Sequence, residues 1–242
     1  MKRIALAFSF LTVIPVRLKE APQPGDLGKS LGWFPLVGAI LGVLVCAAAA
    51  GLPLVFPPLA AAVLSAGLWI GLTGGLHLDG LADCCDGMLN ASSRERRLEI
   101  MKDPRLGTFG GLGLLLAVLL KIAFLSALPA GELWLAVPLA MAAGRWLLLP
   151  AVHQPMARPG GLGAEFSGGA ARVAWLPALA VMGLLTGLAR VRALLAALAA
   201  HAAAWLIFRA ARSRLGGMTG DVFGLTVEIA ELVVLAGFSL IG

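Results

Sequence analysis

The sequence predicts an all-α fold, a polytopic membrane bundle of about seven spans within a range of six to eight. Hydrophobic residues make up 60% of the 242 residues and charged residues only 13%, whereas soluble domains average about 25% charged. The mean hydropathy is +0.93. Several apolar runs also approach the roughly 20 residues that a helix needs to cross a bilayer. We therefore expect residues 1–242 to form one integral membrane domain.

The first apolar stretch, "IALAFSFLTVIPV", follows Met-Lys-Arg and is too short to cross a membrane as a helix. It resembles the start of a signal peptide, but Pro15, Arg17, Lys19 and Glu20 follow it, and no small-residue cleavage site does. We expect a retained interfacial or re-entrant segment.

Seven later apolar runs are expected to be spans, and they are rich in Gly and Ala, as in membrane helices that approach closely. They cover residues 31–52, 54–76, 110–128, 132–152, 173–189, 193–208 and 222–241.

The basic residues predict the orientation of this bundle. The connections on one side hold thirteen Lys or Arg, and those on the other hold only Arg190 and Arg192. Because cytoplasmic loops are enriched in Lys and Arg, the basic side is expected to be cytoplasmic, in the cell inner membrane. The net charge of +6 thus reports topology, and we expect membrane lipid rather than nucleic acid as a partner.

Three acids stand in "HLDGLADCCDG", directly after the second predicted span. In a helix, Asp79, Asp83 and Asp86 share one narrow stripe at i, i+4 and i+7. Carboxylates about 6 Å apart repel by roughly 3 kcal/mol at an effective dielectric near 20. Oxygen ligands in this pattern suit Mg²⁺, with Mn²⁺ as a substitute. A solvated helix end is the alternative. His77 is either a ligand, a phosphate contact or a structural residue.

The stretch "SSRERRLEIMKDPRLGTFGGLG" follows on the same side. Lys102 and Arg105 stand beside glycines that let backbone N–H groups approach an anion, so we expect them to contact phosphate. Asp103 is expected to contact a metal or a hydroxyl. Arg94 and Arg97 are candidate substrate-binding residues, although lipid headgroups are an equally simple partner for them.

A third polar segment, "RLGGMTGDVFGLTVEIAELV", contains Asp221 at a predicted helix start. Asp221 is either an N-cap or a metal ligand. Glu228 follows two turns later on nearly the same face and is a further candidate metal ligand. Lys121 and Arg145 are available counter-ions. A structural ion pair is the simpler interpretation for Lys121 and Glu231, and Arg145 is also a substrate-binding candidate.

"HQPMARPGGLG" forms a fourth patch on the cytoplasmic side. Pro and Gly shape it as a loop rather than a helix. His153 and Arg158 are its candidate substrate-binding residues.

Several of these motifs recur in one order over nearly the whole chain. "FLTVIPV", "GGLHLDGLADCCDG", "RRLEIMKDPRLGTFG", "AGR", "ARPGGLG" and "GGMTGDVFG…EIAELV" resemble the cobalamin synthase family of membrane enzymes, the adenosylcobinamide-GDP ribazoletransferases. The sequence departs from the family where Cys84 and Cys85 replace smaller residues and where Val13 replaces a residue that is often basic. The acids that match the family's motifs are Asp79, Asp83, Asp86, Asp103 and Asp221.

The resemblance implies a Mg²⁺-dependent reaction in which adenosylcobinamide-GDP is joined to α-ribazole or its 5′-phosphate. The products are adenosylcobalamin or its phosphate, and GMP. Within such a site, Asp86 or Asp103 is our candidate acceptor of the ribazole hydroxyl proton. Lys102 and Arg105 are candidates to offset charge on the phosphate oxygens. The sequence also leaves an oligomer open.

Two other functions are weighed against this one. CDP-alcohol phosphotransferases also place spaced aspartates at a helix end, but "DCCDGMLNAS" is offset from their pattern by one residue and the downstream acid pair is missing. A small transporter would use Glu228, Glu231, Lys121 and Arg145 along a path. Most acids here fall on one face instead, which favours an enzyme.

Overall fold

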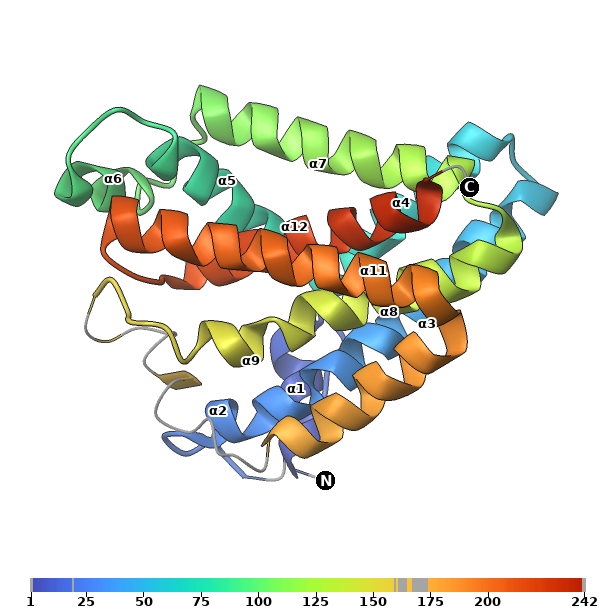
Figure 1. The fold of residues 1–242 in the computed structure, drawn as a ribbon, viewed down its shortest axis with the longest axis horizontal. Helices are drawn as coiled ribbons and strands as arrows, with labels where there is room; N and C mark the ends of the chain where they lie inside the picture. The colour runs from blue at the N-terminus through green and yellow to red at the C-terminus, as the bar shows by residue number, and fades with distance from the viewer. Residues whose placement is uncertain (1, 19, 159, 161–164, 167–173, 241–242) are drawn as a thin grey trace.

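The computed structural model describes residues 2–18, 20–158, 160, 165–166 and 174–240. These residues are overwhelmingly helical, and the predicted all-α membrane fold is confirmed (Figure 1). The helices in chain order are α1 (Lys2–Leu11), α2 (Asp26–Ser30), η1 (Leu31–Trp33), α3 (Phe34–Gly51), η2 (Leu52–Leu54), α4 (Pro58–Thr73), α5 (Leu76–Met88), α6 (Arg94–Ile100), α7 (Thr108–Ala127), α8 (Ala130–Trp146), α9 (Leu148–Ala151), α11 (Trp175–Leu215) and α12 (Gly220–Ser239).

Two helices form the centre of the bundle. In α8 and the residues that follow it, 83% of the most apolar window is buried, and in α12 the share is 67%. In α7 it falls to 22%, and side chains such as Leu112, Leu115 and Leu116 are exposed. In a membrane protein such outward-facing apolar side chains contact lipid. Thus α8 and α12 are the inner helices, and α7 is one of the lipid-facing ones.

The spans only partly follow the prediction of seven. Within the described residues, five helices are long and apolar enough to cross a membrane, and up to six are if the bent pair of α4 and α5 counts as one span. The predicted span 54–76 becomes α4, which turns by 92° into α5. The spans predicted at 173–189 and 222–241 correspond to described helices, although residues 173 and 241 lie outside the described residues.

The loop predicted near residue 190 is wrong. The two spans predicted at 173–189 and 193–208 form one continuous helix, α11, of 41 residues, and its two arms run in different directions (Figure 1). No Gly or Pro occurs from Leu188 to Leu215, so nothing in the local sequence breaks the helix there. The first arm, Trp175–Leu188, is shorter than the other spans.

Small residues allow the central helices to touch. A Cβ atom built on Gly38 of α3 would lie 2.4 Å from the Met141 carbonyl oxygen of α8, and one on Gly42 would lie 2.5 Å from the Pro138 Cα. This is the close backbone approach that a GxxxG pattern permits in membranes. The Gly-rich composition noted in the sequence therefore has a direct packing role.

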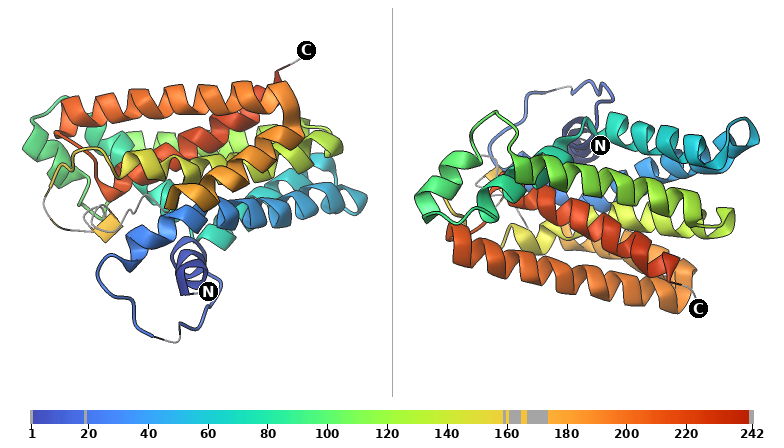
Figure 2. Two further views of the ribbon diagram at one scale, coloured as in Figure 1. Left: turned by 60° about the horizontal axis from the view of Figure 1, so that its bottom comes forward. Right: turned by 90° about the horizontal axis from the view of Figure 1, so that it is seen from above.

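The polar segments gather at one end of the bundle. Figure 1 shows α6, the start of α7, the end of α11 and the start of α12 together at the left. The turn at the opposite end exposes Leu54 and Val55. α1, with ten residues, is too short to span, and in Figure 2 it projects with the following segment from one side of the bundle.

Candidate active site

Helices α5 and α12 cross in close contact at the polar end. A Cβ on Gly80 would lie 2.7 Å from the Asp221 carbonyl oxygen, and one on Gly224 would lie 2.9 Å from the His77 carbonyl oxygen. Larger residues at either glycine would push the helices apart. The crossing therefore brings the acids of α5 beside the first turn of α12.

Three of the predicted acids meet at this point, which we call the acidic crossing (Asp79, Asp83 and Asp221). Asp83 is half-buried and lies in the electrostatic field of Asp221, Asp79 and Asp86. The field of Arg158 reaches Asp221. Asp79 is exposed, and within the described residues no hydrogen bond or ion pair involves its carboxylate.

Asp221 is not the N-cap of α12. The Thr219 side chain accepts the capping hydrogen bond from the Val222 N–H at 3.3 Å, and its hydroxyl donates to the Asp221 carboxylate at 3.2 Å. The N-cap alternative for Asp221 is therefore wrong. Its carboxylate is positioned by Thr219 and stays beside Asp83.

Asp86 faces a different partner, the start of α7. Its two carboxylate oxygens accept hydrogen bonds from the Gly107 and Gly110 N–H groups, each at 2.8 Å. A Cβ on either glycine would lie 2.3 Å from an Asp86 oxygen. Asp86 thus caps a helix N-terminus, where negative charge is favourable. This explains Gly107 and Gly110 of "GTFGG", and a role of Asp86 as metal ligand or base stays a prediction.

Asp103 and Arg105 form a salt bridge on the connection between α6 and α7. The guanidinium donates to the carboxylate at 2.6 and 2.9 Å, and the Arg105 N–H donates at 3.1 Å. These bonds to Arg105 lower the pKa of Asp103 to about 2. Lys102 beside them is exposed. The contacts of Lys102 and Arg105 with phosphate stay predictions.

A second charged cluster lies deeper in the bundle. Lys121 of α7 forms ion pairs with Glu228 at 2.8 Å and with Glu231 at 2.7 Å. Arg145 of α8 pairs with Glu231 and donates to the Met141 carbonyl at 3.2 Å. All four side chains are buried. The geometry agrees with the structural alternative, in which these charges tie helices together.

The same cluster reaches two further helices. His77 of α5 is buried, with its Nδ1 atom 3.4 Å from the Arg145 Nη2 atom. The Lys121 ammonium lies over the Trp69 ring of α4, 4.4 Å from its centre. His77 and Arg145, predicted to bind substrate, are thus packed inside the protein, and Glu228, a predicted metal ligand, has Lys121 as its partner.

The predicted substrate-binding arginines hold the polar connections together. Arg94 donates to the Ala157 carbonyl at 3.0 Å, and Arg158 donates to the Leu98 carbonyl at 2.6 Å. Arg97 donates to the Asn90 carbonyl at 3.0 Å. The first two bonds join α6 to the segment after α9, where part of "ARPGGLG" lies outside the described residues, and the third joins α6 to the α5–α6 connection.

His153 lies at the end of α9. Its Nδ1 atom is 2.7 Å from the carbonyl oxygen of Leu149 in α9, and His153 is exposed. Its ring also lies against the Trp175 ring, and its substrate contact stays a prediction.

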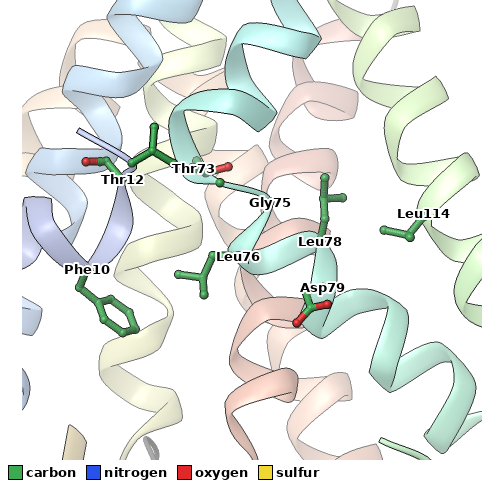
Figure 3. Close-up of a pocket in the computed structure, with 10 residues that line it drawn as sticks. Phe10, Thr12, Thr73, Gly75, Leu76, Leu78, Asp79 and Leu114 are labelled. Atoms are coloured by element: carbon green, nitrogen blue, oxygen red, sulfur yellow. The ribbon is translucent and has the colours of Figure 1, made fainter. Parts of the chain in front are cut away.

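A pocket of about 580 Å³ opens beside the acidic crossing. Figure 3 shows its lining, which comes from the end of α1, the bend between α4 and α5, and α7, with Asp79 at one edge. The bend uses Gly74 and Gly75, with φ of 63° and 69°, angles that favour glycine. The Val13 N–H donates to the Leu72 carbonyl at 3.0 Å, which fixes the end of α1 against the bend.

The pocket residues from α1 were not predicted as site residues. Phe10, Thr12 and Val13 line it, and all three belong to "FLTVIPV". That motif contributes to the family resemblance. The resemblance was therefore the one sequence signal that could have identified these residues as part of a site, but the sequence analysis assigned them no role.

The side chains at the acidic crossing supply only part of the ligand set that a metal ion needs. Within the described residues, no group of three or more His, Cys, Asp or Glu side chains is arranged to hold one. Mg²⁺, however, is commonly held by one or two carboxylates, with waters and substrate phosphates completing its shell. The neighbouring Asp83 and Asp221 match that partial ligand set, although not a closed metal cage.

Apolar spans, acids gathered at one end and an adjoining pocket define a membrane protein with a one-sided polar site, which is typical of a membrane enzyme. Residues 3–239 match the family model described as cobalamin-5-phosphate synthase. The chain belongs to this family of cobalamin-synthesis transferases.

Its relatives share one name, and each matches nearly the whole of this chain. An adenosylcobinamide-GDP ribazoletransferase of Pseudomonas aeruginosa is 42% identical over 248 residues, covering 99% of this chain and 98% of the relative. Those of Deinococcus radiodurans and Roseiflexus are 41% and 38% identical, covering 97% and 98% of this chain and 84% and 89% of the relatives. No solved structure matches the chain.

Proposed function

We propose that this enzyme transfers the adenosylcobinamide phosphate group from adenosylcobinamide-GDP to α-ribazole or its 5′-phosphate, with release of GMP. The activity for which the relatives are named supports the donor and the reaction class. The observation that carries the proposal is the grouping of Asp79, Asp83 and Asp221 beside a pocket at one end of the bundle. We place this end on the cytoplasmic face of the inner membrane, because the basic connections lie there.

The transfer exchanges one P–O bond for another. The ribazole hydroxyl oxygen attacks the phosphorus that carries the corrinoid group, and its proton passes to a carboxylate. The bridging P–O bond of the diphosphate breaks, and GMP leaves with the bonding electron pair. Positioning and charge neutralisation dominate such reactions, since there is little other chemistry for a protein to do.

Different residues at the acidic crossing neutralise charge and accept the proton. Asp83 and Asp221 would hold Mg²⁺ together with the diphosphate, and the ion would supply positive charge against the phosphate oxygens. Asp79 faces the pocket and takes the hydroxyl proton, since Asp86 and Asp103 are engaged with α7 and Arg105. Lys102, exposed on the connection between α6 and α7, would contribute further positive charge toward the leaving GMP.

The proposal is tested by turnover of the purified protein. Adding adenosylcobinamide-GDP, α-ribazole and Mg²⁺ in detergent is expected to release GMP in proportion to the corrinoid product formed. Omitting the ribazole should abolish GMP release. Flux of a solute across sealed vesicles without any GMP release would instead support a transporter.

A further inference from the structure

Another pocket, which we call the α11 pocket, lies on the second arm of α11 toward the polar end of the bundle. It has a volume of about 520 Å³, and among the described residues Trp205, Arg209, Arg212 and Ser213 line it. In a helix these positions share one face, because the last three follow Trp205 by four, seven and eight residues. The described lining of the pocket beside the acidic crossing includes none of the four, so the two pockets are distinct.

The helix face that carries the α11 pocket changes from apolar to basic along its length. Leu194 and Leu198 precede Trp205 by eleven and seven residues on the same stripe, and both are exposed, as expected of side chains that contact lipid tails. Trp205, also exposed, is of the type that lies at the boundary between tails and headgroups. Arg209 and Arg212 follow about 6 and 10 Å further along the axis, at the depth of the headgroups.

The two arginines of the α11 pocket are held on the helix face by other side chains. The Arg209 guanidinium lies over the Trp205 ring, 4.8 Å from its centre. Arg212 donates to the Gln154 side-chain oxygen at 3.0 Å. Each guanidinium has further N–H donors, and within the described part of the chain neither forms an ion pair with a carboxylate. Two positive charges are thus placed together without an acidic partner.

Charge and position together identify the ligand class. A guanidinium binds a phosphate group through parallel N–H donors, and basic pockets on membrane helices attract anionic lipids. A zwitterionic lipid carries its own ammonium group beside its phosphate and therefore gains less from two arginines. The Ser213 hydroxyl donates to the Ala210 carbonyl at 3.1 Å, and its lone pairs stay available to accept from a headgroup hydroxyl.

We infer that the α11 pocket binds the headgroup of an anionic phospholipid. The phosphate lies between Arg209 and Arg212, a headgroup hydroxyl lies at Ser213, and the acyl chains run along the exposed leucines of the same helix. The inference goes beyond the proposed reaction and does not depend on it. The simpler alternative is a solvated helix end whose arginines serve only to orient the protein in the membrane, and it predicts no preference among headgroups at this pocket.

Native mass spectrometry of the purified, delipidated protein tests the preference, with equimolar phosphatidylglycerol and phosphatidylcholine added to the detergent. The wild type is expected to bind phosphatidylglycerol about tenfold more than phosphatidylcholine. The double variant Arg209→Gln/Arg212→Gln is expected to bind the two lipids equally. Equal binding by the wild type, or an undiminished preference in this double variant, would overturn the inference.

A matched control removes the same amount of charge from another place. Lys29→Gln/Arg96→Gln changes two exposed basic residues that do not line the α11 pocket. It is expected to keep the preference for phosphatidylglycerol. If it loses the preference as fully as Arg209→Gln/Arg212→Gln does, the net charge of the protein selects the lipid and the pocket is not a site.

A further variant tests the support that Trp205 gives to Arg209. Trp205→Ala is expected to lower phosphatidylglycerol binding about threefold, because the guanidinium loses the ring beneath it. Trp134→Ala, at an exposed tryptophan of α8 outside the pocket, should leave binding unchanged. Unchanged binding in Trp205→Ala would contradict the placement of the headgroup beside this ring.

A competition experiment separates a lipid from a soluble phosphate. Inorganic phosphate or glycerol 3-phosphate, each in about tenfold excess over the lipid, is expected to displace little phosphatidylglycerol, because neither has acyl chains to bury. Complete displacement by either compound would show that the α11 pocket takes a soluble phosphate, and it would overturn the assignment to a lipid.

Discussion

Asp86 is the acid whose surroundings differ most from those of its neighbours on α5. Its two oxygens accept N–H groups of Gly107 and Gly110, whereas Asp79 and Asp83 face the pocket and α12. The sequence predicted from helical spacing that the three acids share one stripe. Spacing gives the face of a helix but not the neighbour that packs there, so the contact of Asp86 with the start of α7 could not be predicted.

Gly110→Ala is expected to destabilise the protein by about 1–3 kcal/mol, because the new Cβ overlaps the Asp86 carboxylate and breaks a charge-assisted hydrogen bond. Thermal unfolding in detergent measures the change. Gly111→Ala is the matched control: its Cβ would meet only Leu106, at 3.9 Å, so the better helix propensity of Ala should stabilise by up to about 1 kcal/mol. Equal losses in both variants would argue against the cap.

Asp103 is expected to make no contribution to the pH dependence of the reaction. Arg105 lowers its pKa from 3.8 to about 2, so the carboxylate stays ionised at working pH. Any stability from this pair is present above about pH 4 and is lost only as the pH falls through about 2. Between about pH 5 and 9, Asp103→Asn should leave the acid limb of the kcat profile in place. If the acid limb of the kcat profile shifts in Asp103→Asn, Asp103 is the base after all.

At the scale of helices, the buried cluster of Lys121, Arg145, Glu228 and Glu231 connects three helices and balances two positive with two negative charges. The sequence identified these residues as counter-ions within spans, because charges at that depth need partners. It left the pairing open, because the pairing depends on how α7, α8 and α12 are rotated about their axes.

Lys121→Met is expected to destabilise the protein by about 3–5 kcal/mol, because Glu228 and Glu231 lose a buried partner. Adding Glu228→Gln to this variant should recover part of the loss, since one uncompensated charge is removed. Thermal unfolding of both variants checks this. Arg192→Ala breaks only the partly exposed pair with Glu132 at 3.4 Å, and it should cost less than about 1 kcal/mol. If the double variant is no more stable than Lys121→Met, Lys121 and Glu228 are not energetically coupled.

Breaks between helices were the least predictable elements. Gly74 and Gly75 mark the 92° bend between α4 and α5, yet the sequence allowed the apolar run to continue through them as one span ending at residue 76. Conversely, a loop was expected near residue 190, where α11 stays helical and changes direction. In both places the apolar composition is continuous, so the hydropathy pattern alone does not distinguish a bend from a straight helix or a loop.

At the scale of the whole molecule, the distribution of charge predicted the arrangement well. Acids and arginines were expected on one side of the bundle, and the structure gathers α6 and the starts of α7 and α12 at one end. This succeeded because the positive-inside rule and the cost of charge in lipid act on whole connections rather than on single contacts.

The orientation of the bundle is tested by labelling with a membrane-impermeant maleimide. Glu99→Cys, at the polar end, is expected to react only after the cells are permeabilised. Val55→Cys, 79% exposed at the opposite end, is expected to react in intact cells. The native cysteines Cys46 and Cys84 are buried, and a wild-type sample corrects for Cys85. The reverse labelling pattern would place the acidic crossing outside the cytoplasm.

The most direct test of the account is GMP release by Asp83→Asn at saturating Mg²⁺, with Glu99→Gln as a surface control at the same end of the bundle. The substitution keeps the shape of the side chain and removes its charge from the acidic crossing. We expect turnover to fall about 100-fold or more, with Glu99→Gln unchanged. Near-normal turnover by Asp83→Asn would contradict the claim that the meeting of α5 and α12 is where the reaction takes place.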